Sequence, residues 1–157
     1  MEDGRQMSGP YVYANVDDLE GAELVGNKQC AGLVQHYVNV GTTEYWTNGK
    51  HVRGNGPSIA KGTAVATFLN DAEEEKGYYA NAKHNNHAAF YISQDATGIK
   101  VMDQWAGDKN KPKISSRVMR FLGKNKDGTY VNPSNNGEAL SVIMKSAKVM
   151  RPKRAGV

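Results

Sequence analysis

The chain has 157 residues, a length that suits one domain and is short for two. Hydrophobic residues make up 39% and charged residues 23% of it, which indicates a soluble globular protein and excludes a disordered chain. One cysteine excludes an internal disulfide framework, and no apolar run approaches the ~18 residues of a membrane span. The N-terminus MEDGRQMSGPYVYANVDD lacks the basic start and apolar run of a cleaved signal peptide, so we expect a protein made in the cytoplasm without one.

The net charge of +4 is distributed unevenly between the two halves of the chain. Residues 1–80 carry 6 Lys/Arg against 11 Asp/Glu, or −5, whereas residues 81–157 carry 14 against 5, or +9. A basic half can bind nucleic acid, an anionic envelope polymer or an acidic partner protein. It can equally be a solvated basic surface, so charge alone does not choose among these partners.

The first predicted element is a helix that carries the cysteine. Asn27 is a favourable N-cap, which places Gln29 and Cys30 in the first turn. Gly41 is expected to end the helix. One face repeats apolar residues at helical spacing: Cys30, Leu33, Val34, Tyr37 and Val38. The thiol therefore belongs to the buried stripe but lies at its open, N-terminal end.

The remainder of the chain reads as strands and turns. Residues 42–62 are rich in Gly, Asn and Pro and are predicted to be a loop, and the run 71–86 a helical turn followed by irregular chain. Short β-branched or aromatic segments predict five strands, at 62–69, 87–94, 98–105, 115–123 and 138–145. The connection at Asp95–Gly98 is short enough for a hairpin. The sequence thus predicts an α+β fold, a single domain over 1–157, with one helix packed on an antiparallel sheet of about five strands.

Cys30 is the candidate nucleophile, because a thiol in the first turn of a helix ionises more easily than usual. The alternative is a packing role, since a lone cysteine on an apolar stripe is more often part of the core. A cysteine nucleophile needs a base, and the four histidines differ in their expected placement. His36 is predicted to face solvent, and His51 and His84 lie in irregular segments. His87 begins a strand, where sheet hydrogen bonds would fix its side chain, and is therefore the preferred base.

The hairpin places a third polar group near this histidine. With a turn at Asp95–Gly98, the start of one strand faces residues 103–106 of the next, so Asp103 is expected to orient His87. Asp103 would accept from Nδ1–H and leave Nε2 free for the thiol. A slip of one residue in the register would bring Gln104 to the histidine instead. Gln104 is also expected to bind substrate. Trp46, in the glycine-rich loop, is expected to border the substrate cleft, although a core position is an equal alternative.

The order of these segments resembles that of papain-like NlpC and CHAP amidases, and more closely the type VI secretion amidase effectors. Four segments carry the resemblance: LEGAELVGNKQCAGLVQHY (19–37), Trp46, KGTAVATF (61–68) and NNHAAFYISQDATGIKVMDQW (85–105). The sequence departs from the NlpC pattern at Ala31-Gly32 after the cysteine, and at the NNH triplet before the second predicted strand.

The resemblance implies a papain-like fold and hydrolysis of peptide bonds in peptidoglycan, either within a stem peptide or at a crosslink. Cys30 would attack the carbonyl, His87 would transfer the proton and Asp103 would orient His87. The backbone N–H of Cys30, with Gln29 as a weaker candidate, would bind the oxyanion. It also implies delivery by a secretion machine into the periplasm of a target bacterium, and a cognate immunity protein in the producing cell.

Three other functions are open at this stage. His84 and His87 with Cys30 could form a sparse zinc site, but no second Cys or HxxxH motif supports it. The basic half, ending in RPKRAGV, could bind nucleic acid, but its aromatic residues do not alternate with Lys/Arg as in recognition modules. A non-catalytic peptidoglycan-binding module would not need Cys30. The amidase hypothesis predicts no metal, no cofactor, no nucleic-acid partner and no membrane association.

Overall fold

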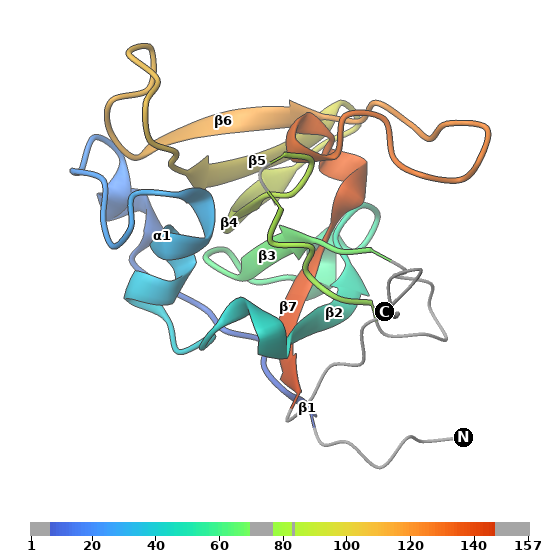
Figure 1. Ribbon diagram of the computed structural model, residues 1–157, viewed down its shortest axis with the longest axis horizontal. Coiled ribbons are helices and arrows are strands. Elements are labelled where there is room, and N and C mark those ends of the chain that lie inside the picture. Colours follow the sequence, from blue (N-terminus) through green and yellow to red (C-terminus); the bar gives the residue numbers. More distant parts are fainter. Residues whose placement is uncertain (1–6, 70–76, 83, 147–157) are drawn as a thin grey trace, which may run out of the picture.

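An antiparallel sheet organises the fold (Figure 1). The computed structural model describes residues 7–69, 77–82 and 84–146. The helical turn expected at the front of 71–86 falls largely, and the basic end RPKRAGV wholly, outside these ranges. The strands are β1 (Met7–Ser8), β2 (Trp46–His51), β3 (Ala64–Thr67), β4 (Ala88–Gln94), β5 (Gly98–Asp103), β6 (Ser115–Arg120) and β7 (Leu140–Ser146). Their order is β1-β7-β3-β4-β5-β6, with β2 also paired to β7.

The predicted α+β class is confirmed, with seven strands in the described residues rather than about five. The two additional strands are β1 and β2. Strand β1 has two residues, and β2 has the sequence WTNGKH, whose Asn and Gly predicted a loop. Both strands pair antiparallel with β7, so tertiary pairing has overridden weak local preference. Short 3₁₀ turns connect the strands, at Val16–Leu19, Thr43–Tyr45, Gly56–Ser58, Pro133–Asn135 and Gly137–Ala139.

Helix α1 (Cys30–Tyr37) lies against β4 and covers one face of the sheet (Figure 1). Alternate residues of β4 serve the two faces. Ala88 and Phe90 pack in the cluster under the helix with Leu33, whereas Ala89 and Tyr91 pack in a second cluster on the opposite face. His36 is exposed, as predicted. This alternation determines which polar side chains at the ends of β4 and β5 can meet.

The helix begins later and ends earlier than the sequence predicted. Its N-cap is Gln29 rather than Asn27, its last residue is Tyr37, and Gly41 lies beyond it with φ +69°. Lys28 has φ +67°, a left-handed conformation that cannot start a helix. Asn27 instead accepts a hydrogen bond from the Gln29 N–H at 2.9 Å, which closes a local turn just before the helix.

Trp46 lies in the core, so its predicted place at the border of the cleft is wrong. Its side chain is 0% exposed, Nε1 donates to the Val40 carbonyl at 3.0 Å, and the ring packs 4.9 Å from that of Tyr79. The glycine-rich composition around Trp46 concealed a strand that carries this residue inward. Trp46 therefore supports Tyr79, which itself lines a cleft.

Replacing Trp46 by alanine should lower the free energy of unfolding by about 3–5 kcal/mol, because it empties a large buried volume and leaves the Val40 carbonyl unpaired. Urea denaturation of the purified variant measures this loss. The half-buried Trp105, the second tryptophan of the chain, provides a matched Trp→Ala control with a smaller expected loss. A Trp46→Ala variant as stable as the parent would contradict the core assignment.

Candidate active site

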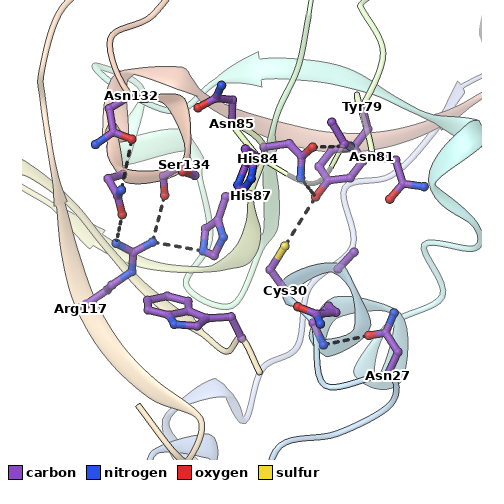
Figure 2. A pocket seen from close by; sticks show the side chains of 16 residues that line it. Asn27, Cys30, Tyr79, Asn81, His84, Asn85, His87, Arg117, Asn132 and Ser134 are labelled. Atoms are coloured by element: carbon purple, nitrogen blue, oxygen red, sulfur yellow. Dashed lines mark hydrogen bonds between the residues drawn. The ribbon is translucent and has the colours of Figure 1, made fainter. Parts of the chain in front are cut away.

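A cleft of about 850 Å³ opens at the N-terminal end of α1, beside the start of β4 (Figure 2). Four parts of the chain line it: residues around Cys30, the segment from Tyr79 to His87, the side chains of Trp105 and Arg117, and the turn from Asn132 to Asn135. Cys30 and His87 therefore share one cleft, as predicted. Gln29 also lines it, whereas Trp46 and Gln104 do not.

Cys30 occupies the first position of α1, with Gln29 as the cap. Its backbone N–H is among the first of the helix, which lack intrahelical acceptors and lie at the positive end of the helix dipole. Gly32 permits the close packing of this helix start, because a Cβ there would stand 2.2 Å from Asn27 Oδ1. The turn at Asn27 therefore packs directly against the first turn of the helix, which carries the thiol.

His87 is fixed at the start of β4 by bonds to the neighbouring strand. Its backbone N–H donates to Thr67 Oγ1 at 2.9 Å, and its carbonyl accepts from the Thr67 N–H at 3.0 Å. The residue is only 4% exposed, and its Nε2 lies 2.7 Å from Asp103 Oδ2. The predicted partner is thus correct, but the nitrogen is not: Nε2–H donates to the carboxylate, so Nδ1 is the nitrogen available to Cys30.

The register of the hairpin decides between Asp103 and Gln104. Phe90 pairs with Met102, which places Asp103 opposite Ala89 and on the same face of the sheet as His87. Gln104 points to the other face and is fully buried, so its predicted contact with substrate is wrong.

Gln104 instead anchors the segment that leads into the helix. Its Oε1 accepts from the Val25 N–H at 2.9 Å, and its Nε2 donates to the carbonyls of Val25 at 2.9 Å and Gln29 at 2.8 Å. The residue after Asp103 therefore holds the chain just before Cys30, so the C-terminal end of β5 and the residue that follows it position both His87 and the thiol.

Tyr79 contacts the thiol from the side opposite the helix start. Its hydroxyl lies 3.6 Å from Cys30 Sγ, accepts from Asn86 Nδ2 at 3.2 Å, and the residue is 1% exposed (Figure 2). Burial and the neighbouring thiol raise the pKa of Tyr79, so the phenol keeps its proton and can donate it to a thiolate. The sequence carries no signal for Tyr79, because its segment follows the acidic run and has no periodic pattern.

The pKa values of the three aligned groups favour an ionised pair. Burial raises the pKa of Cys30, but hydrogen bonds from His87, Tyr79 and the Ala88 N–H together with the charge of His87 lower it to about 7. Burial lowers the pKa of His87, but the bonds and charges of Asp103 and Cys30 raise it overall. Burial also opposes ionisation of Asp103, yet His87 and two nearby cations hold its pKa well below the usual range. A thiolate beside an imidazolium is therefore accessible near neutral pH.

The residues that the structure describes give no support to the zinc site that the sequence left open. In the described ranges, His, Cys, Asp and Glu form no group of three or more arranged to hold a metal ion. His84 lines the cleft but is exposed. Across the same ranges, the structure contains no helix of the length and apolar character needed to cross a membrane.

Comparisons with known proteins bear on the family and the fold of the chain. The sequence profile of the family "Domesticated amidase effector 2" matches residues 6–143. The type VI secretion amidase effector 2 protein of Salmonella typhi is 46% identical over 138 residues, which cover 85% of this chain and 98% of that protein. The domesticated amidase effector 2 of Ixodes scapularis is 33% identical over 122 residues, covering 76% and 72%.

A solved structure of a type 6 secretion amidase effector 2 shares 46% identity with the chain, covers 86% of it and 94% of its own length, and superposes with a TM-score of 0.76. The resemblance stated from the sequence is thereby confirmed at the level of fold and family. The chain belongs to the domesticated amidase effector 2 family.

Proposed function

We propose that this protein is a peptidoglycan amidase that uses Cys30 as its nucleophile and acts as an antibacterial effector. The observation that carries the proposal is that Cys30 and His87 share one cleft, with the buried Asp103 bonded to His87, in a chain from an amidase effector family. The thiol lies at a helix start, its base is fixed by β3, and the carboxylate that orients the base is fully buried.

The reaction follows from these contacts. The Cys30 thiolate attacks the carbonyl carbon of an amide, and the negative charge that develops on oxygen is stabilised by donors at the helix start, including the Cys30 N–H. The imidazolium of His87 gives its Nδ1 proton to the leaving amine, and the C–N bond breaks to leave a thioester. His87 then takes a proton from water, which attacks the thioester, and the acid product leaves as the thiolate is regenerated.

Each neighbour has a defined task in this cycle. Asp103 accepts from Nε2–H at 2.7 Å and so holds the tautomer and the ring plane. The Tyr79 hydroxyl, 3.6 Å from Sγ, supports the thiolate before attack. Gln29 lines the cleft beside Cys30 and is a further candidate for the oxyanion.

The lining of the cleft suits a peptide substrate. Six asparagines contribute to it: Asn27, Asn81, Asn85, Asn86, Asn132 and Asn135. Amide side chains donate and accept, which matches the alternating N–H and C=O groups of a peptide. We propose as partners the stem peptides of peptidoglycan, a secretion machine that delivers the protein to the periplasm of a target bacterium, and an immunity protein that blocks the cleft in the producing cell. The crosslink is our preferred scissile bond.

Digestion of purified sacculi tests the proposal directly. The protein should convert crosslinked muropeptides into monomers that carry a new carboxylate and a new amine, detected by mass spectrometry. Cleavage within the stem would instead release shortened peptides, which identifies the other amide bond. Binding to sacculi without any new chain ends would contradict the amidase proposal and favour a binding module.

A further inference from the structure

The carboxylate of Asp103 is shared among three cationic or proton-donating side chains. Oδ2 accepts both from His87 Nε2 and from Arg117 Nε, each at 2.7 Å, and Oδ1 lies 2.9 Å from Lys111 Nζ. Asp103 is 0% exposed, and Lys111 is 8% exposed. Two cations on one buried carboxylate leave a charge of +1 even before His87 is protonated. Such an excess exceeds what orientation of a histidine requires.

Arg117 extends beyond Asp103 to the opposite wall of the cleft. Its Nη2 lies 3.3 Å from His87 Nε2 and donates to the Ser134 carbonyl at 3.1 Å, while Nη1 donates to Asn135 Oδ1 at 2.9 Å (Figure 2). Ser134 and Asn135 belong to the turn that lines the cleft across from Cys30. Each nitrogen of the guanidinium is therefore used, and the side chain joins the histidine–carboxylate pair to the far wall.

Trp105 holds this arrangement in place. The guanidinium carbon of Arg117 lies 4.8 Å from the centre of the indole ring, and Lys111 Nζ lies 4.9 Å from it. The centre of the His87 ring lies 5.9 Å from the centre of the indole ring, and the interplanar angle of 69° is that of an edge-to-face contact. An aromatic face that attracts both cations restricts where they can move, so the contacts to Asp103 are preorganised.

Strand pairing explains how Arg117 reaches this position. On β6, Ser115 pairs with Asp103 and Arg117 with Val101, so Arg117 is the diagonal neighbour of Asp103 on the same face of the sheet. The charged and titratable groups around His87 come from five parts of the chain: Cys30, Tyr79 with His84, Asp103, Lys111 with Asp108, and Arg117.

We propose that Arg117 is a positioning residue with two separable functions: its fork fixes the ring of His87 through Asp103 and the 133–135 turn, and its charge sets the pH range over which the Cys30–His87 pair is active. The inference rests on the proposed function for its kinetic readout. Its second readout requires no substrate.

The two functions have different chemical requirements. A cation beside the pair favours the thiolate and disfavours the imidazolium, so its removal should raise the pKa of both groups and move both limbs of a pH profile upward. Lysine keeps the charge but cannot reproduce the fork that contacts Asp103, Ser134 and Asn135. Arg117→Lys should therefore lower kcat without moving the pH profile. Arg117→Met should lower kcat and also move the pH profile upward.

Alkylation of Cys30 by iodoacetamide supplies the readout that needs no substrate. The chain has a single cysteine, so the rate of alkylation as a function of pH reports that thiolate alone. We expect the thiolate transition to move upward by roughly one pH unit in Arg117→Met and to stay in place in Arg117→Lys. The value of kcat should fall about 10²-fold in both variants, because the base is misplaced.

Arg120→Met is the matched control, since Arg120 is exposed on the same strand and does not contact Asp103. It should match the parent in kcat, in alkylation and in pH profile. Circular dichroism and urea unfolding establish that each variant is folded before rates are compared. If Arg117→Met does not fold, Arg117→Gln takes its place.

Two results would overturn the proposal. One is an Arg117→Met variant with the kcat and the pH profile of the parent. The other is an upward shift in Arg117→Lys as large as that in Arg117→Met, because charge would then not set the range. If the parent alkylates as expected but does not cleave sacculi, the proposed substrate is wrong, while the alkylation profiles still test the effect of the charge.

Discussion

Replacing Cys30 by alanine should reduce the hydrolysis of peptidoglycan on the order of 10⁶-fold, the size of loss that follows removal of a catalytic nucleophile. No other cysteine exists in the chain to substitute for it. The side chain is small and only partly buried, so the free energy of unfolding should change by less than about 1 kcal/mol. Loss of activity would then come from chemistry rather than from unfolding.

The measurement is the release of new amines from sacculi by matched amounts of the parent and the variant. Cys30→Ser is the conservative companion, because a hydroxyl in the same place is not ionised by His87 near neutral pH. It should be almost as inactive as the alanine variant. Full activity of Cys30→Ala would eliminate the cysteine mechanism altogether.

Replacing His87 by alanine should reduce kcat by roughly 10³-fold or more, whereas His84→Ala should change it only a few-fold. Both imidazoles line the same cleft, so the comparison distinguishes a catalytic histidine from one that only lines the cleft. His87 is held by Thr67 and bonded to Asp103, while His84 is exposed. The pKa of Cys30, about 7 in the parent, should also rise in His87→Ala because the thiolate loses its main partner.

Steady-state rates on sacculi together with alkylation of Cys30 at several pH values distinguish the two variants. Equal losses in kcat would mean that both histidines act together, as in a metal site, and would contradict the assignment. An unshifted alkylation profile in His87→Ala would show that the thiolate is stabilised by other groups, such as the Tyr79 hydroxyl.

The sequence predicted those parts of the fold that depend on local pattern. The hairpin at Asp95–Gly98 places His87 near residues 103–106, because a short turn leaves few registers. The register shifts by one residue between Tyr91 and Ser93, and this irregularity, which the sequence did not predict, brings Asp103 rather than Gln104 to the face of His87. The start of the helix was predicted two residues too early. Asn27 is a favourable cap by type, but the left-handed Lys28 makes it a turn residue. A helix pattern cannot reveal such a backbone conformation.

Contacts between segments that are distant in the sequence could not be predicted from local sequence patterns. The tautomer of His87 depends on which nitrogen faces Asp103, and that follows from the side-chain rotamer rather than from the register. Strand β2 and the burial of Trp46 depend on pairing with β7, almost a hundred residues later. Arg117 became visible only once β6 was aligned with β5, since its sequence neighbours are those of an ordinary edge strand.

The bonds of Gln104 bear on when the protein becomes reactive. They join β5 to Val25 and Gln29 across 79 and 75 residues of sequence, so the segment before Cys30 is secured only after much of the chain has assembled. Contacts of such long range carry a large loop-closure cost, which slows their formation. In an unfolded chain the thiol has no imidazole beside it and an ordinary, weakly nucleophilic character. The chain therefore acquires its readily ionised thiol only on folding, and the rate of alkylation near neutral pH reports whether the segment before Cys30 has taken its native place.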